Sequence, residues 1–293
     1  MGRDLAEAFP VARRTFAEAD EHLGYALSRL CFEGPAETLE LTEHAQPAIL
    51  TTSVAAYRVL REVTGLVPRA LAGHSLGEWS ALVASGALDF GDAVRGVRAR
   101  GRLMQSAVPV GMGAMAAVMG LEAEVVAALC EEAAAGEVLA PANFNGGGQI
   151  VVAGHAGAVE RFVALAAARR ARAKRLAVSA PFHCPLMEPA ARGLVEVLAD
   201  VRFCEPAIPV VTSVEARLVG GGAELRELLV RQVTAPVRWE ETVRVLVALG
   251  AEVALEVGPG TTLAGLARRI APGLRVLTAG DGAGVAQARE VLA

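Results

Sequence analysis

The chain has 293 residues, enough for one large domain or for a core domain that carries a smaller one. Hydrophobic residues make up 53% of it and aromatic residues only 4%, which favours helices packed on a buried sheet over an aromatic-rich β-sandwich. The net charge of −4 argues against a nucleic-acid binder, which needs a basic surface.

The first part of the chain predicts helices around one short strand. Apolar residues at helical spacing predict a helix over residues 46–64 that ends at Gly65. A short strand over 70–73 runs directly into a helix that starts near Gly77. Asp89 can cap the next helix, which extends to about residue 108.

The middle of the chain predicts a small subdomain over residues 113–179, inserted into a larger one. The order β-α-β-β-α-β is that of a ferredoxin-like unit. Its elements are expected as a strand over 114–120, a helix over 122–135, strands over 138–144 and 149–153, a helix over 157–171 and a strand over 174–179.

After residue 180 the pattern of alternating strands and helices resumes. Strands are predicted over 208–214, 252–258 and 275–279, with helices between and after them. This alternation indicates an α/β fold with a mainly parallel sheet covered on both faces. The larger subdomain is therefore expected to comprise residues 1–112 and 180–293.

Cysteine usage and hydropathy bear on the compartment. The four cysteines lie far apart, with no C-x-x-C pair and no histidine at metal-ligand spacing, so we expect reduced thiols and no metal site. Charges, glycine or proline interrupt every apolar run that could cross a bilayer, and the N-terminus has no apolar secretory core. We expect a cytoplasmic protein without membrane association.

One segment, Gly73-His74-Ser75-Leu76-Gly77, fits the pattern G-x-S-x-G between a predicted strand and a predicted helix. A nucleophile elbow requires this context, because its sharp turn exposes the serine hydroxyl at the carboxyl end of the sheet. The flanking glycines remove Cβ atoms where strand and helix crowd together. The N–H of Leu76, at the positive end of the helix, is placed to donate to an oxyanion. The alternative is a tight turn whose serine caps the helix.

The helix that starts near residue 91 carries arginines on opposite faces. At 100° per residue, Arg95, Arg98 and Arg102 share one face, as on an ordinary solvated helix. Arg100 lies almost opposite them, at the edge of the apolar stripe. A guanidinium directed toward the core needs a carboxylate or phosphate partner. Helix geometry alone does not separate a structural salt bridge from a clamp on a substrate carboxylate.

Among five histidines, His183 lies where a base is needed, between a predicted strand and a helix that Pro185 is suited to begin. A helix N-terminus disfavours imidazolium, and the neutral ring is the form that a general base needs. The alternative is a structural histidine. No acid between the serine and this histidine suits the third position of a triad, so a dyad oriented by a backbone carbonyl fits better. The other histidines are expected to pack beside the turn (His74) or to lie at the surface (His22, His44, His155).

Five segments resemble the malonyl-CoA:acyl carrier protein transacylase family and the related polyketide-synthase acyltransferase domains. The likeness runs in order from residue 1 to about residue 272, which makes it more specific than any single motif. It implies a hydrolase-like core with a ferredoxin-like insert. The segments are GHSLGEWSALVASGALDF, RGRLMQSAVPVGMGAM, NFNGGGQIVVAG, APFHCPLMEPAA and LEVGPGTTLAGL.

The resemblance implies a role for each matching residue. Ser75 would be the acylated nucleophile, His183 its base, and Arg100 the residue that holds the malonyl carboxylate. Gln46 would line the same pocket, and the main-chain carbonyl of Gln232 would orient the histidine.

By the same resemblance, Asn143 and Asn145 match asparagines of the small subdomain near the site. Phe182 precedes the histidine, as in malonyl-selective relatives. Its bulk would crowd an α-methyl branch, so we expect malonyl to be preferred over methylmalonyl, by ~10–200-fold at most.

The implied reaction is a ping-pong transfer from malonyl-CoA to the phosphopantetheine thiol of an acyl carrier protein, in fatty-acid or polyketide synthesis. It needs no cofactor, and the resemblance suggests a monomer. A basic run could meet the acidic carrier or coenzyme A phosphates, or could simply complement a helix dipole. That run comprises Arg169, Arg170, Arg172, Lys174 and Arg175.

The start of the chain departs from the family pattern. Family members usually open with a β-strand and a Gly-Gln-Gly-Ser-Gln turn before the segment that resembles MGRDLAEAF, and this chain begins after both. We therefore expect a start at an internal methionine or a trimmed chain. The missing glutamine ordinarily supplies a second oxyanion N–H, whose loss can cost ~10²–10³ in rate.

Three other functions remain open. A serine thioesterase would use the same dyad and give the acyl group to water, but a hydrolase of neutral acyl groups has no use for a buried Arg100. A truncated, inactive chain could only bind a carrier. A patatin-like lipase is the weakest, because Asp281-Gly282-Ala283 mimics its aspartate motif only in the C-terminal tail.

Overall fold

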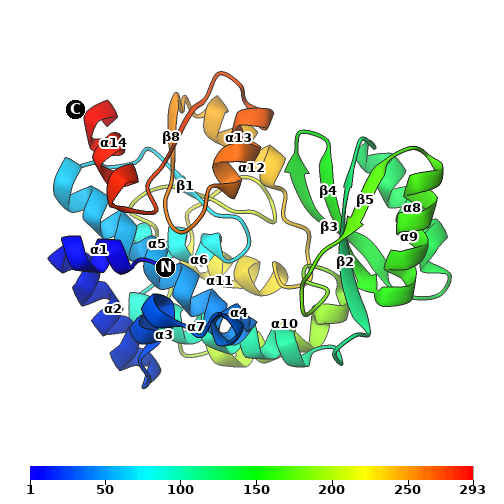
Figure 1. The fold of residues 1–293 in the computed structure, drawn as a ribbon, viewed down its shortest axis with the longest axis horizontal. Helices are drawn as coiled ribbons and strands as arrows, with labels where there is room; N and C mark the ends of the chain where they lie inside the picture. Colours follow the sequence, from blue (N-terminus) through cyan, green and yellow to red (C-terminus); the bar gives the residue numbers. More distant parts are fainter. Residues whose placement is uncertain (293) are drawn as a thin grey trace.

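The computed structural model describes residues 1–292, which form a large α/β part and a small unit beside it (Figure 1). The chain starts and ends in the large part, where α14 packs against α5 and α1. The helices of the large part are α1 (Arg3–Ala8), α2 (Pro10–Leu23), α3 (Leu27–Glu33), α4 (Ala36–Glu40), α5 (Thr42–Thr64), α6 (Gly77–Ala84), α7 (Phe90–Ser106), α10 (Glu188–Leu198), α11 (Gly222–Arg231), α12 (Trp239–Ala248), α13 (Thr262–Ile270) and α14 (Gly282–Leu292), with a 3-10 turn η1 (Pro185–Met187).

The two helices that carry site residues, α5 and α7, pack directly against each other. Helix α5 ends at Gly65 with φ of 68°, as predicted, but begins at Thr42, one turn earlier than expected, so that Pro47 lies inside it. A Cβ at Gly101 of α7 would lie 2.5 Å from the Thr42 carbonyl oxygen. Helix α7 therefore needs a glycine where it approaches the start of α5.

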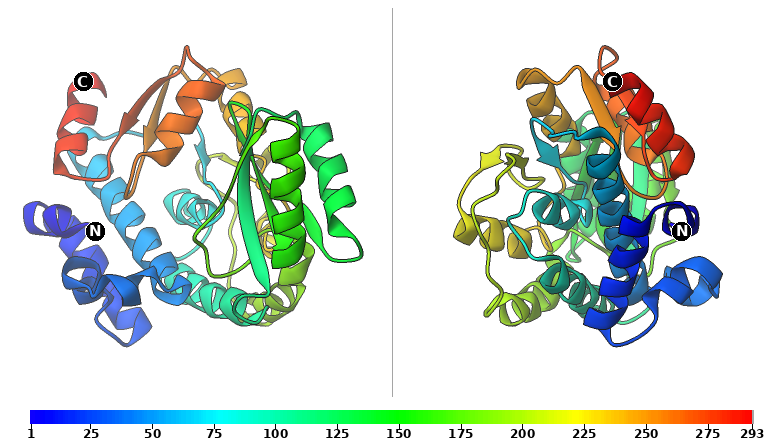
Figure 2. Two further views of the ribbon diagram at one scale, coloured as in Figure 1. Left: turned by 45° about the vertical axis from the view of Figure 1, so that its right-hand side comes forward. Right: turned by 90° about the vertical axis from the view of Figure 1, so that its left-hand side faces the viewer.

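The small unit is a four-stranded antiparallel sheet in the order β3-β4-β2-β5. Figure 2 shows α8 and α9 covering the face of this sheet that points away from the large part. Its order β-α-β-β-α-β was predicted, except that the last strand ends earlier than expected. The elements are β2 (Gly113–Met119), α8 (Ala123–Ala134), β3 (Leu139–Gly146), β4 (Gln149–His155), α9 (Ala156–Ala168) and β5 (Arg172–Arg175).

The two faces of the small sheet pack on different partners. One face forms a separate apolar core with α8 and α9, which includes the fully buried Phe162. The other face, including Met115 and Val151, packs on Phe182 and Cys184 of the large part. Since these two residues flank His183 in sequence, the small sheet forms a wall beside the predicted base.

The large part contains two short sheets among the described residues, where one mainly parallel sheet was expected. Strand β1 (Leu71–Ala72) runs parallel to β6 (Val210–Val211), which pairs antiparallel with β7 (Leu218–Val219). Strands β8 (Val253–Glu256) and β9 (Arg275–Thr278) form a separate parallel pair.

Strand β6 is much shorter than the predicted 208–214 because the residues before and after it in sequence do not continue the strand pairing. Pro209 has no N–H to donate. After the strand, the N–H of Thr212 donates to Arg217, and the N–H of Ser213 donates to the side chain of Glu78. The chain therefore leaves the sheet early and turns toward α6.

The turn from β1 to α6 presents Ser75 in a left-handed conformation, with φ of 51°. Non-glycine residues adopt this region rarely and at an energetic cost, which is typical of a nucleophile elbow. A Cβ at Gly73 would lie 1.9 Å from the carbonyl carbon of Gly77, whereas a Cβ at Gly77 would meet nothing within 4 Å. Of the two flanking glycines, only Gly73 is therefore required for steric reasons.

This asymmetry makes Gly73→Ala and Gly77→Ala a matched pair. We expect Gly73→Ala to lower the free energy of unfolding by about 1–3 kcal/mol, because the methyl group must displace backbone. Gly77→Ala should change it by less than about 0.5 kcal/mol. Urea unfolding of both variants checks this, and equal losses would contradict the steric assignment.

Candidate active site

The structure brings Ser75 and His183 into direct contact. The serine Oγ lies 2.7 Å from His183 Nε2, although the two residues are 108 positions apart in sequence. His183 is buried and, like the serine, has a left-handed backbone, with φ of 59°. Both residues of this contact adopt a rarely occupied backbone conformation, which indicates that the surrounding structure enforces the contact.

The other ring nitrogen, His183 Nδ1, donates to the main-chain carbonyl of Gln232 at 2.8 Å. Because the proton is then on Nδ1, Nε2 is free to accept from the serine hydroxyl. No carboxylate among residues 1–292 bonds to this histidine. The pair and its carbonyl therefore have the geometry that was predicted for a dyad without a third acid.

The pKa of His183 is lowered from 6.5 to about 3, chiefly by burial and also by the nearby positive charge of Arg100. The hydrogen bond to the Gln232 carbonyl opposes this shift, but it is weaker than the effect of burial. The ring is therefore neutral at physiological pH, as a general base must be.

Arg100 is only 2% exposed and points at the serine. Its guanidinium donates to Gln46 Oε1 at 2.7 Å, to Gln232 Oε1 at 3.1 Å and to Ser75 Oγ at 3.2 Å. Burial lowers its pKa to about 10, which leaves it charged at neutral pH. None of the ion pairs between described residues includes it. The structural salt bridge considered from the sequence is thus not what this arginine makes.

Sequence analysis missed one charged residue of the site, Glu78. Its carboxylate is fully buried, and Oε2 accepts from Ser213 Oγ at 2.5 Å, from Ser213 N at 3.1 Å and from Gln232 Nε2 at 2.7 Å. Burial raises its pKa, while these donors and Arg100 oppose the rise. An acid in the first turn of a helix is common at the surface, so the sequence contains no signal that this one is buried.

The small unit contributes two buried asparagines on β3, Asn143 and Asn145. Asn145 Oδ1 lies 2.9 Å from His74 Nε2, and its amide donates to Gln149. It therefore meets the residue next to the serine rather than the serine itself. Asn143 makes no side-chain hydrogen bond with the described residues, and its main chain bridges to Val237.

Two residues beside the dyad, Phe182 and Leu76, differ in exposure. Phe182 is half-buried and packs against both the large core and the apolar face of the small sheet. Leu76 is 9% exposed, and its N–H has no acceptor among residues 1–292. Both are therefore available to a group bound at Ser75.

Three histidines expected at the surface are instead half-buried, each with a structural partner. Packing between helices and strands accounts for their partial burial, and none of the three bonds to Ser75 or His183. The contacts join His22 Nδ1 to Arg95, His44 Nδ1 to the Tyr25 hydroxyl, and His155 Nδ1 to the N–H of Val138. His74 does pack beside the turn, with its ring edge-on to Trp239.

The basic run, for which docking and a helix-dipole role were both left open, is partly neutralised. Arg169 pairs with Glu132 at 3.4 Å, and Arg175 pairs with Glu160 at 3.3 Å. The run leads into β5, which is an edge strand of the small sheet. Charged side chains on an edge strand also protect it from pairing with another chain, so these cations have a structural function independent of docking.

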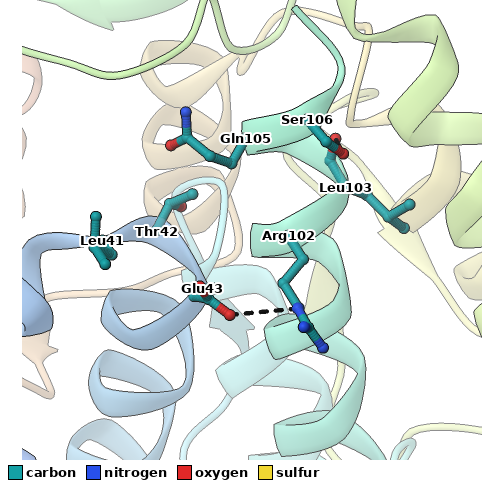
Figure 3. A pocket seen from close by; sticks show the side chains of 7 residues that line it. All are labelled: Leu41, Thr42, Glu43, Arg102, Leu103, Gln105 and Ser106. Carbon is teal, nitrogen blue, oxygen red and sulfur yellow. Dashed lines mark hydrogen bonds and ion pairs between the residues drawn. The ribbon is translucent and has the colours of Figure 1, made fainter. Parts of the chain in front are cut away.

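An open pocket of about 410 Å³ lies between the start of α5 and the end of α7 (Figure 3). Glu43 and Arg102 face each other across it at 3.3 Å. Ser75 and His183 do not line it. One of its lining residues, Thr42, is linked to the site, because its hydroxyl accepts from Gln46 Nε2 at 2.9 Å.

Within residues 1–292, no group of acids, histidines and cysteines is arranged to hold a metal ion. Among the same residues, no helix has the length and apolar character needed to cross a membrane.

A family model described as "Acyl transferase domain" matches residues 1–272. The chain belongs to the acyl transferase family. The malonyl CoA-acyl carrier protein transacylase of Escherichia coli (strain K12) is 49% identical to it over 294 residues, which cover 99% of this chain and 94% of that protein.

Solved structures of the family superpose closely on this chain. The malonyl CoA-acyl carrier protein transacylase of Coxiella burnetii gives a TM-score of 0.97 at 41% identity, covering 100% of this chain and 93% of that one. A malonyl-transacylase in complex with its type II PKS acyl-carrier protein gives 0.97 at 47% identity, covering 99% and 94%. The whole described chain thus has the mixed α/β fold of these transacylases.

The lowered pKa of His183 makes stability depend on pH. Between about 3 and 6.5 the unfolded chain binds a proton that the folded chain does not. The free energy of unfolding should therefore decrease as pH falls below 6.5, by about 1.4 kcal/mol per pH unit for this one proton, and keep its full value above 6.5. Urea unfolding of the wild type and of His183→Gln at several pH values checks this. Parallel pH dependences would contradict it.

Proposed function

We propose that this acyl transferase moves a malonyl group from coenzyme A to the phosphopantetheine thiol of an acyl carrier protein. The observation that carries the proposal is the buried guanidinium of Arg100, which lies 3.2 Å from the nucleophile without a carboxylate partner. A malonyl group on Ser75 brings its free carboxylate into this vicinity and supplies the missing anion. The names of the relatives point to the same reaction.

In the first half-reaction, Ser75 Oγ attacks the thioester carbonyl while His183 Nε2 takes the hydroxyl proton. The tetrahedral oxyanion accepts a hydrogen bond from the N–H of Leu76, which is free for this purpose. The C–S bond then breaks, and the histidine returns the proton to the leaving thiolate. The product is a malonyl ester of the serine and free coenzyme A.

In the second half-reaction the thiol of the carrier is the nucleophile. His183 accepts the thiol proton, the sulfur attacks the malonyl ester, and the serine leaves with the proton from the histidine. Every step uses side chains or main-chain groups of this chain, so no metal or cofactor enters the proposed chemistry. The carrier is the proposed partner, and the enzyme is proposed to act as a monomer.

Selectivity is proposed to come from both ends of the acyl group. Arg100, held by Gln46, selects the terminal carboxylate, and the half-buried Phe182 crowds a methyl branch at the α-carbon. Asn143 and Asn145 are proposed to shape the same pocket from the side of the small unit.

The finer description of the fold is also proposed. We assign residues 113–179 to a ferredoxin-like subdomain, on the basis of its β-α-β-β-α-β order and four-stranded antiparallel sheet. Residues 1–112 and 180–293, of which residue 293 lies outside the described residues, are then assigned to a hydrolase-like subdomain, for which the elbow between β1 and α6 is the supporting feature.

Intact-protein mass spectrometry after brief incubation with malonyl-CoA tests the reaction. We expect a malonyl adduct on the wild type and none on Ser75→Ala, because the adduct is the acyl-serine intermediate. Adding a carrier protein should discharge it. An adduct that decays equally fast without carrier would support the thioesterase alternative, and no adduct at all would support the inactive, carrier-binding one.

The role of Arg100 is tested by comparing malonyl-CoA with acetyl-CoA. Arg100→Ala should slow acylation by malonyl-CoA ~10²-fold, the value of a charge-assisted contact, and leave acylation by acetyl-CoA no slower. Arg102→Ala is the matched control, because this exposed arginine lies on the same helix and should leave both rates unchanged. Equal losses with both thioesters would contradict the carboxylate clamp.

A further inference from the structure

Glu78 takes no part in the acyl transfer described above, yet it is completely buried beside the residues that do. A buried carboxylate is costly unless hydrogen bonds and an opposite charge compensate for it. All its hydrogen bonds converge on Oε2, and Oε1 has no partner among the described residues. Three donors on one oxygen, and no acceptor for a proton on the other, fit the ionised form.

One partner of Glu78 is Gln232, which bonds to the site through both its main chain and its side chain. Its main-chain carbonyl accepts from His183 Nδ1, and its side-chain Oε1 accepts from Arg100 at 3.1 Å. Its Nε2 donates to Glu78 at 2.7 Å and to the Ser75 carbonyl at 3.1 Å. One residue thus supports the base, the guanidinium and the backbone of the nucleophile.

The orientation of the Gln232 amide depends on having an acceptor on one side and a donor on the other. The Glu78 carboxylate can only accept, and the Arg100 guanidinium can only donate. Turning the amide over would place its N–H₂ against the guanidinium and its oxygen against the carboxylate. The Glu78 carboxylate, together with the Ser75 carbonyl, therefore fixes which end of the amide faces Arg100.

We propose that Glu78 is a positioning residue for the acyl transfer: its carboxylate fixes Gln232, and through Gln232 it holds the tautomer and place of His183 and the orientation of Arg100. This inference rests on the proposed function. Glu78 touches neither the reacting atoms nor the acyl group, so its effect passes entirely through its neighbour.

The position of Glu78 also balances charge without blocking the site. The amide of Gln232 lies between the carboxylate and the guanidinium, so the two charges attract each other without forming a contact pair. Each favours the charged form of the other, since Glu78 raises the pKa of Arg100 and Arg100 lowers that of Glu78. The guanidinium thus stays charged while its face toward Ser75 remains open to a substrate carboxylate.

A helix-dipole role does not explain this placement. An acid in the first turn of α6 would favour the helix equally well from the surface. The bonds of Glu78 instead reach Ser213 and Gln232, which are 135 and 154 positions away in sequence. They tie the start of α6 to the second residue after β6 and to the end of α11.

The test compares Glu78→Ala with Glu78→Gln, which keeps an acceptor oxygen for the Gln232 amide. The rate of Ser75 malonylation and the final extent of labelling are followed by intact-protein mass spectrometry. We expect Glu78→Ala to lower the rate ~10²-fold at full final extent, and Glu78→Gln to stay within ~10-fold of the wild type, because loss of the correct histidine tautomer is costly in such sites. The rate should also fall with acetyl-CoA, because His183 serves both thioesters, and this separates the effect from loss of the Arg100 clamp alone.

Glu256→Gln is the control, because this half-buried carboxylate also accepts N–H bonds from another element, those of Leu263 and Ala264. It should lower stability without changing the acylation rate. A Glu78→Ala variant that acylates at the wild-type rate would overturn the proposal. A Glu78→Ala variant with a lower final extent of labelling but an unchanged rate would also overturn it. A lower final extent reports a fraction of unfolded protein, not misplaced catalytic groups.

Ring ¹⁵N chemical shifts of His183 give a readout that is independent of the reaction. The wild type and Glu78→Gln should show a single tautomer with the proton on Nδ1, and Glu78→Ala should show a mixture of tautomers. If the wild type forms no malonyl adduct, the proposed function fails while this measurement still decides the role of Glu78. An unchanged single tautomer in Glu78→Ala would then refute the positioning role of Glu78.

Discussion

A cation buried without a carboxylate in contact must be stabilised by dipoles, and the surroundings of Arg100 are arranged to supply them. The amide oxygens of Gln46 and Gln232 face the guanidinium from α5 and from the end of α11. Both amides are held by further bonds, to Thr42 and to Glu78 respectively. The packing of α5, α7 and α11 around Ser75 is therefore coupled to one charge, which the proposed function pairs with the carboxylate of an incoming acyl group.

The two reacting residues share a backbone feature that helps to explain this organisation. Ser75 and His183 both have positive φ, a conformation that costs free energy in residues with side chains. Neither turn would hold this geometry in isolation. The serine turn is compressed against Gly77, and the histidine is fixed through its ring to the Gln232 carbonyl. Tertiary contacts thus maintain locally unfavourable geometry, and the buried ring keeps the neutral form that chemistry requires.

Much of this arrangement could be predicted from the sequence, because it depends on local patterns. Helical periodicity placed Arg100 on the inner face of α7, and strand-turn-helix context identified the elbow. Glu78 could not be found in this way, since its burial depends on partners more than 130 positions distant. The short β6 was also missed, because a side chain on another element takes the N–H of Ser213 that would otherwise extend the strand. Contacts of this kind arise only when distant segments fold together.

The chain enters and leaves the small unit at almost the same place. The N–H of Leu176, just after β5, donates to Met115 in the first half of β2, and a Cβ at Gly113 would lie 2.4 Å from the Pro181 ring. An insertion whose ends lie together imposes little loop-closure cost on its host and can be exchanged as a cassette. The dyad and Arg100 belong to the host, whereas Asn143 and Asn145 belong to the insertion. The strand that carries these asparagines can therefore vary as a module while the Ser75–His183 pair stays constant.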